Sequence, residues 1–237
     1  LCHLFAMHIN FYAGSGLDRA SHVRRDEAWL LAQLSAPTTR VVPVWRSQSL
    51  MVMGDAPTAV YFVTHGPQGH AFSYLRTGSA ASRLSPQSLA DSGAKAYIQQ
   101  ARWLHVSGIS MAISTSACDT VLAAMAWARE CQTQVSLDAN LRLKLWPLAR
   151  AQACLKQAIT LCDVFLPSQD EVKPLMGADD PLAVLDWAQQ LGARHVVLKR
   201  GAQGAVVRTG TQQCESAGHA GQPVDATGAG DCCAGNL

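Results

Sequence analysis

Short, nearly continuous hydrophobic runs alternate with longer segments of helical periodicity from about residue 102 onward. The runs predict buried strands at 103–106, 134–138, 163–166, 195–199 and 205–208. The segments between them predict helices at 117–131, 149–161, 168–176 and 181–191. Ser114, Ser168 and Asp180 stand where helix N-caps are expected. Strands alternating with helices are typical of an α/β fold whose mostly parallel sheet is covered on both faces.

The region before this alternation has a different pattern. Residues 58–64 and 70–75 are β-rich and aromatic, and a Gly-containing turn separates them, so we expect a hairpin. Tyr74 and Arg76 fall at the end of its second strand, where they could face a pocket. Residues 1–55 show no strand-helix alternation, apart from a candidate strand at 41–45. We therefore predict an unassigned segment (1–55), a small β lid (56–83) and an α/β core (84–237).

Composition excludes several classes of protein. The 237 residues are 49% hydrophobic and 15% charged, which suits one large core, and the formal net charge is +2. Basic residues form no stripe, so a nucleic-acid partner is not expected. No apolar run reaches the roughly 18 residues that span a bilayer, so no membrane partner is expected. No leader pattern precedes the fold and the 8 cysteines form no C-x-x-C pair, which favours reduced thiols in a cytoplasmic protein.

Polar residues and glycines follow each predicted strand of the core. These strand ends carry residues 138–142, 167–171, 199–204 and 225–231. In open α/β sheets, ligands bind at the carboxyl ends of the strands. A set of this composition predicts a polyphosphate site at one edge of the sheet.

The last of these segments, Asp225-Ala-Thr227-Gly228-Ala229-Gly230-Asp231, suggests anion chemistry. Small residues let backbone N–H groups converge, and a helix N-terminus adds positive potential. Asp231 could then accept a proton from a substrate hydroxyl. No Lys-Ser or Lys-Thr pair follows the glycines, so the segment is not a P-loop. Read alone, it could equally be a simple turn, with Asp231 as a helix N-terminal carboxylate.

Taken together, these motifs resemble the ribokinase-like, or phosphofructokinase B-type, carbohydrate kinases. The 225–231 segment is similar to the C-terminal signature of that family, and Asp138-Ala-Asn140-Leu-Arg142-Leu-Lys-Leu-Trp146 resembles an element typical of its 2-keto-3-deoxygluconate kinase branch. Residues 56–62 and 74–80 look like the sugar-acid lid. The resemblance covers about residues 56–237 and implies a three-layer ribokinase-like sandwich with a small β lid.

The resemblance also implies a reaction and a set of roles. The family transfers the γ-phosphoryl group of ATP, with Mg²⁺, to a sugar hydroxyl. Asp231 would be the catalytic base, and Gly228, Ala229 and Gly230 would form the anion hole. The substrate would contact Tyr74, Arg76, Arg142 and Asp231, with both arginines on a sugar-acid carboxylate. Glu171 would orient Mg²⁺ through water. The residues expected to bind ATP are Asn140, Lys199, Gly201, Gly204, Thr227, Gly228 and Gly230.

Other interpretations stay open at this point. Arg76 and Arg142 could be surface residues, and Glu171 could be a favourable charge in a first helical turn. A neutral sugar such as fructose or ribose is an alternative substrate. The family's β lid often pairs between subunits, so a homo-oligomer is an option.

The sequence also departs from the family pattern. The Gly-Gly-x-x-x-Asn motif of the family is not found in residues 1–55, and the chain ends at Leu237. Ser168, Cys233 and Ala59 stand where an Asn, a bulky apolar residue and a Gly are usual. We therefore also consider an inactive, truncated remnant whose first 55 or so residues are foreign or out of frame.

Overall fold

The computed structural model describes residues 10–12, 56–57, 59–66, 69–218, 221, 230 and 233–234. The chain divides into two compact units. Among the described residues, the smaller unit contains those from 56 to Arg83, and the larger unit contains 10–12 together with those from Leu84 onward.

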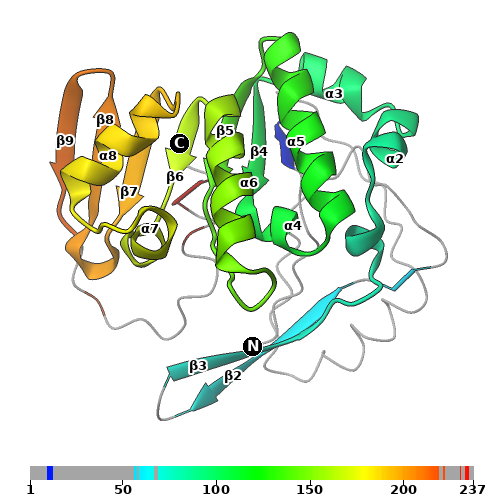
Figure 1. Ribbon diagram of the computed structural model, residues 1–237, viewed down its shortest axis with the longest axis horizontal. Coiled ribbons are helices and arrows are strands. Elements are labelled where there is room, and N and C mark those ends of the chain that lie inside the picture. Colours follow the sequence, from blue (N-terminus) through cyan, green and yellow to red (C-terminus); the bar gives the residue numbers. More distant parts are fainter. Residues whose placement is uncertain are drawn as a thin grey trace. The chain divides into compact units, whose positions relative to one another are not determined.

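The larger unit alternates strands with helices through most of its length (Figure 1). Its elements are, in chain order, β1 (Asn10–Tyr12), α2 (Pro86–Asp91), α3 (Ala94–Gln100), β4 (Trp103–Ser107), α4 (Gly108–Ala112), α5 (Thr115–Glu130), β5 (Gln134–Asp138), α6 (Leu148–Leu161), β6 (Val164–Leu166), α7 (Gln169–Met176), α8 (Pro181–Gln190), β7 (His195–Lys199), η2 (Gly201–Gln203), β8 (Ala205–Thr209) and β9 (Gln212–Ser216).

The strands of this unit form one sheet in the order β1-β4-β5-β6-β7-β8-β9. The central strands β4, β5, β6 and β7 are parallel to one another. β1 pairs antiparallel with β4 at one edge, and the antiparallel strands β8 and β9 form the other edge. The predicted parallel sheet is therefore confirmed at the centre, and antiparallel strands extend it on both sides.

One face of the sheet is covered by α5, α6, α7 and α8 (Figure 1). Consecutive parallel strands are neighbours in space and all crossovers proceed in the same direction, so right-handed connections bring their helices to the same side. Val106, Leu137, Phe165 and Val196 are laterally paired, share this face and are almost completely buried. Phe165 packs edge-on against Trp187 of α8, with ring centroids 6.2 Å apart.

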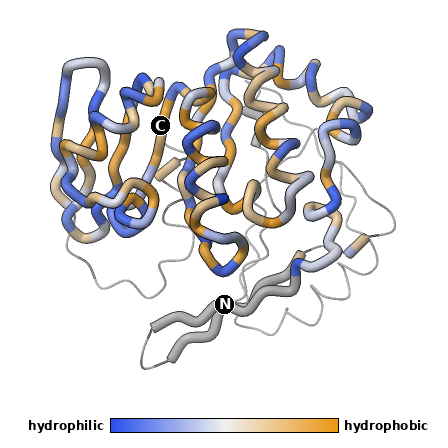
Figure 2. Tube along the Cα trace, in the orientation of Figure 1, coloured by the Kyte–Doolittle hydropathy of each residue, from blue (hydrophilic) through white to orange (hydrophobic). Residues whose placement is uncertain are grey.

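The opposite face has its own apolar cluster. Val164, Leu166 and Val197 are buried there, and Ala234, a residue in helical conformation, packs against them. Strongly hydrophobic positions follow the central strands in Figure 2. Burial on both faces explains why these strands read as continuous apolar runs rather than alternating ones. It also agrees with the layered arrangement that the sequence predicts.

The helix starts follow from local chemistry. Ser114 accepts a hydrogen bond from the backbone N–H of Ala117 at 3.0 Å and caps α5. Asp180 accepts one from the N–H of Ala183 at 2.9 Å and caps α8, with Pro181 in its first turn. Both satisfy N–H groups that have no partner within the helix. The predicted caps are confirmed.

Several elements are absent from the sequence prediction. The helices α2, α3 and α4 are each seven residues or shorter, too short to display a clear helical period. β9 is exposed at every position and therefore lacks apolar alternation. β1 lies in the segment that we left unassigned. The candidate strand at 41–45 lies outside the described residues.

The smaller unit contains a two-stranded antiparallel hairpin, β2 (Val60–Gly66) and β3 (Gly69–Leu75), followed by the short 3₁₀ helix η1 (Ala80–Arg83). The predicted hairpin is thus confirmed, with Tyr61 opposite Tyr74 in its register. In the part of the chain that the structure describes, no helix has the length and apolar character needed to cross a membrane.

Candidate functional site

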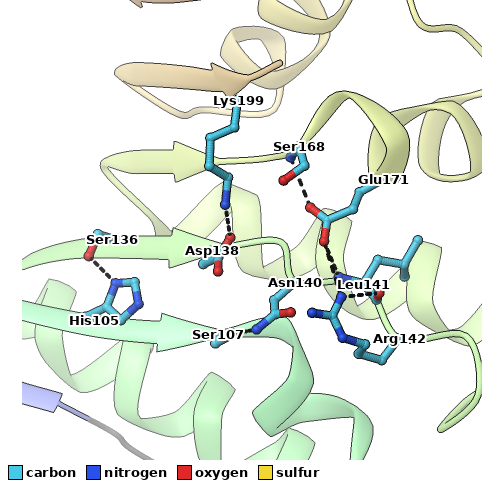
Figure 3. A network of polar contacts seen from close by, with 10 residues as sticks. All are labelled: His105, Ser107, Ser136, Asp138, Asn140, Leu141, Arg142, Ser168, Glu171 and Lys199. Carbon is cyan, nitrogen blue, oxygen red and sulfur yellow. Dashed lines mark hydrogen bonds and ion pairs between the residues drawn. The ribbon is translucent and has the colours of Figure 1, made fainter. Parts of the chain in front are cut away.

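The carboxyl ends of the parallel strands meet at one edge of the sheet and carry a connected set of polar side chains (Figure 3). The register aligns Ser107 with Asp138, and Asp138 with Leu166. Ser168 forms an isolated parallel bridge with Lys199, which brings the end of β7 to the same level. The edge predicted from the strand-end residues is therefore formed.

An ion pair between Asp138 and Lys199 lies at the centre of this edge. The Lys199 Nζ donates to Asp138 Oδ1 at 2.7 Å, and the two side chains are 17% and 7% exposed. Asp138 ends β5 and Lys199 ends β7, so the pair reaches across the end of β6. The sequence placed Lys199 in an ATP site, but it did not assign its partner.

The loop that follows β5 has a constrained backbone. Asn140 has a φ of 35°, in the left-handed region that few non-glycine residues adopt. Its Nδ2 donates to the Ser107 Oγ at 3.0 Å. Gly108 lies against the loop, and a Cβ added there would be 2.0 Å from the carbonyl oxygen of Ala139. Ser107 and Gly108 therefore fix the loop and the direction of the Asn140 side chain.

Glu171, in the first turn of α7, ties a second strand end to the same loop. Its Oε1 accepts the backbone N–H of Leu141 at 2.9 Å, and its Oε2 accepts that of Ser168 at 3.0 Å. Burial raises the pKa of Glu171 above its ordinary value of 4.5, and the nearby Asp138 carboxylate raises it further. The two N–H donors and the Lys199 ammonium lower this pKa in part.

Glu171 was predicted to orient Mg²⁺ through water. Each of its carboxylate oxygens accepts one N–H bond, so each keeps a lone pair for a bridging water. Among the described residues no group of three His, Cys, Asp or Glu side chains could hold a metal ion directly. The role of Glu171 in orienting Mg²⁺ through water therefore stays a prediction.

Arg142 is an exposed charged residue of this loop. Its Nη1 donates to the carbonyl oxygen of Leu141 at 2.9 Å and lies 3.7 Å from Glu171 Oε1. The side chain is nevertheless 43% exposed, so its remaining N–H groups can take an incoming carboxylate. The substrate role that the resemblance implies for Arg142 stays a prediction.

The glycines after β7 shape the turn into β8. Gly201 and Gly204 have φ of 56° and 89°, respectively. A Cβ on Gly204 would lie 1.9 Å from the Ser216 carbonyl oxygen, so this glycine allows the end of β9 to approach the turn closely. Gly204 therefore has a packing role, whatever its role in binding ATP.

Gly230 lies beside the ion pair between Asp138 and Lys199. A Cβ on Gly230 would be 3.9 Å from Lys199 Nζ, so the backbone of Gly230, which is helical, comes close to the ammonium group. Thr227, Gly228, Ala229 and Asp231 lie outside the described residues, as do the side chain of Tyr74 and its surroundings. Arg76 belongs to the smaller unit.

The sequence missed the contributions of Asp138 and Ser107. Both end a strand, and register along the parallel sheet could have placed them beside each other. The partner of Asp138 could not be found this way, since nothing local connects it with a lysine 61 residues later.

The class of protein is an open α/β sheet with charged residues and glycine turns at the carboxyl ends of its strands, which is where ligands bind in sheets of this kind. Residues 46–237 match the family model of the pfkB family carbohydrate kinases. The chain therefore belongs to the pfkB family.

Curated relatives include two 2-dehydro-3-deoxygluconokinases; 2-dehydro-3-deoxygluconate is the same compound as 2-keto-3-deoxygluconate. The protein of Bacillus subtilis (strain 168) is 32% identical over 209 residues, which are 86% of this chain and 61% of the relative. That of Thermoproteus tenax is 34% identical over 157 residues, 64% of this chain and 46% of the relative. A probable fructokinase-7 of Arabidopsis thaliana is 34% identical over 184 residues, 75% of this chain and 52% of the relative. The chain thus spans less than two thirds of the length of these relatives.

Solved structures share the fold. A PfkB protein from Polaromonas sp. JS666 superposes with a TM-score of 0.70 at 29% identity, covering 88% of this chain and 66% of its own. A putative ribokinase II from E. coli in complex with ATP and Mg²⁺ gives a TM-score of 0.66 at 26% identity, covering 75% and 56%, respectively. The ribokinase-like fold predicted from the sequence is confirmed.

Proposed function

We propose that this protein is an ATP-dependent kinase that phosphorylates a hydroxyl group of a sugar acid, 2-keto-3-deoxygluconate. The observation that carries the proposal is the polar network at the carboxyl edge of the sheet. It combines an accessible arginine, Arg142, with a partly buried lysine, Lys199, close to the backbone of Gly230. One ligand of this edge would then be a carboxylate and the other a phosphate.

The proposed reaction needs a base and an anion hole. The carboxylate of Asp231 takes the proton of the sugar hydroxyl as the hydroxyl oxygen attacks the γ-phosphorus, and the bond to the bridging oxygen of ADP breaks. The N–H groups of Gly228, Ala229 and Gly230 stabilise the charge on the transferring group. Magnesium, when bound through water to Glu171, neutralises phosphate charge. These roles rest on the family motif.

Substrate choice would depend on the arginines. Arg142 extends from the loop that Ser107 and Glu171 hold in place, so its guanidinium is presented by a fixed backbone. A planar guanidinium can bind a carboxylate with two parallel hydrogen bonds. Arg76 belongs to the smaller unit, and its role in binding the sugar rests on the family resemblance alone.

A neutral-sugar kinase is the second candidate, favoured by the relatives named as fructokinases. A neutral sugar would bring no carboxylate of its own for Arg142 to bind. The two candidates therefore differ in what Arg142 contributes.

The test is ADP release by the purified chain with ATP, Mg²⁺ and either 2-keto-3-deoxygluconate, fructose or ribose. We expect turnover with the sugar acid and none with Asp231→Asn. Arg142→Ala should raise KM for the sugar acid by about tenfold to a hundredfold, the value of a charge-assisted hydrogen bond. Arg194→Ala is the matched control, since this exposed arginine lies near Asp163, at the amino ends of the strands and not at their carboxyl ends. Turnover of fructose or ribose that Arg142→Ala leaves unchanged would favour the neutral-sugar candidate, and no ADP release with any sugar would contradict both.

A further inference from the structure

The ion pair between Asp138 and Lys199 connects two strands that are not neighbours. β6 lies between them, and its end is paired with both sides: Leu166 is in register with Asp138, and the N–H of Lys199 donates to the carbonyl oxygen of Pro167 at 2.9 Å. The side chains of Asp138 and Lys199 therefore meet across the end of β6 (Figure 3). If either side chain left this contact, the other would remain as an unpaired charge in a largely buried site.

Such a pair adds little net stability. Removing two charges from water costs free energy, and the attraction between them roughly offsets this cost. The stronger effect of the pair is geometric, because the carboxylate selects one conformation of a side chain with four rotatable bonds. A free lysine side chain loses rotamer entropy when a ligand orders it. Asp138 orders Lys199 before any ligand arrives.

The ordered ammonium lies close to the backbone of Gly230, a residue of the motif proposed to hold phosphate. The Lys199 Nζ is 3.9 Å from the position of a Cβ on Gly230. Lys199 thus stands between the carboxylate of Asp138, at the end of β5, and the backbone of Gly230.

We propose that Asp138 is a positioning residue that holds the Lys199 ammonium beside Gly230, where it meets the phosphates of ATP. The inference rests on the proposed function, because it assigns the phosphates to that segment. Asp138 acts only through Lys199 and does not touch the nucleotide. Arg142, in the loop that follows β5, is held instead through Ser107 and Glu171, so the role of Asp138 concerns the ATP phosphates alone.

The experiment compares Asp138→Asn, Lys199→Met and the double variant with the wild-type chain. The affinity for ATP is measured by equilibrium titration without sugar, together with KM for ATP and for the sugar acid. Asp138→Asn and Lys199→Met should each weaken ATP binding by about tenfold, with KM for the sugar acid changed by less than about twofold. The double variant should bind ATP as Lys199→Met does, because Asp138 has no effect once the lysine is gone.

Asp163→Asn is the matched control. Asp163 is a buried aspartate of the same sheet that accepts the N–H of Val135 at 2.9 Å, near the amino ends of the strands. Its substitution should lower the unfolding midpoint in urea without changing the affinity for ATP. A loss of ATP affinity equal to that of Asp138→Asn would mean that general destabilisation causes the effect, and would overturn the proposal.

Two further outcomes separate the inference from the proposed function. Equal ATP affinity in the wild type and Asp138→Asn would overturn the positioning role, even if the chain phosphorylates the sugar acid. A wild type that binds ATP, loses affinity in Asp138→Asn and phosphorylates no sugar would support the positioning role and remove the kinase proposal. If Asp138→Asn does not fold, the comparison of Lys199→Met with the double variant decides. Equal ATP affinity in these two variants supports the positioning role, and a weaker ATP affinity in the double variant overturns it.

Discussion

Asn140 shows how single residues determine the geometry of this edge. Its left-handed backbone conformation costs energy for most residues, but asparagine tolerates it better than others do. The bond to Ser107 and the close approach of Gly108 to Ala139 compensate for the remaining strain. Strained residues of this kind cluster at functional sites, where the surrounding structure maintains them.

Ser107→Ala should release this side chain. Loss of the hydroxyl leaves the Asn140 amide without its acceptor, so we expect about 1 kcal/mol less stability and a higher KM for both substrates. Urea unfolding and steady-state kinetics check this. Ser136→Ala, which removes a 2.8 Å bond to His105 two residue pairs before the strand ends, should cost similar stability and leave both KM values unchanged. Unchanged KM values in Ser107→Ala would show that the loop does not need the bond.

Glu171 should make stability depend on pH. Because its pKa is raised in the folded chain, the folded state keeps a proton that the unfolded state releases above about pH 4.5. Its contribution to the free energy of unfolding is fully present below that pH and is lost as the pH rises through the folded-state pKa. Urea unfolding from about pH 4 to about pH 8 should therefore show a steeper decline for the wild type than for Glu171→Gln. Parallel pH profiles would contradict the raised pKa.

Among the elements, the turn between β7 and β8 depends on close contact between backbones. η2 and Gly204 pack against Ser216, the last residue of β9, and against the two residues that follow it. This contact connects β9 to the turn that is predicted to bind ATP. A change in this contact should affect both.

Gly204→Ala should be costly, because its Cβ would overlap backbone atoms that cannot rotate away. We expect a loss of about 3 kcal/mol or more, from the clash and the positive φ together. Gly210→Ala has a positive φ of 57° but open space around its Cβ, so it should cost only about 1 kcal/mol. Thermal or urea unfolding of the two variants gives the comparison. Equal losses would mean that the turn can move away from β9.

For the larger unit as a whole, its cysteines offer a probe of unfolding. Burial raises the pKa of both Cys118 and Cys162 to about 12, whereas Cys214 on β9 is exposed. Since the thiolate is the reactive form, the first two should resist a thiol reagent at about pH 8. Peptide mapping should find Cys214 modified in the native chain, and Cys118 and Cys162 only after urea unfolding. Rapid labelling of Cys162 in the native chain would contradict its burial.

How far the sequence predicts this molecule depends on the range of the interactions. β5 and β7 are found at the expected residues, because apolar runs between polar ends carry their own signal. The helix caps at Ser114 and Asp180 are equally local. The sequence pattern does not predict β1, α2 and β9. β1 pairs with a strand that is remote in sequence, α2 is very short, and β9 is short and exposed at every position.

For the site, the strand ends predicted the edge but not its internal pairing. Lys199, Asn140, Glu171 and Arg142 lie at this edge, as expected, and the structure connects them to Asp138 and Ser107. The pairing of Asp138 with Lys199 depends on the strand order, which residue types do not reveal. The roles of Asp231 and the residues before it stay predictions.

The strand order has a consequence for how the chain acquires its structure. β4 to β7 join the sheet in the order in which they are synthesised, so each new strand closes only a short loop. β1 is the exception, since its residue Tyr12 pairs with Trp103 of β4. The long loop it must close makes β1 the expected last strand to dock and, with three residues, the first to exchange its amide protons with water.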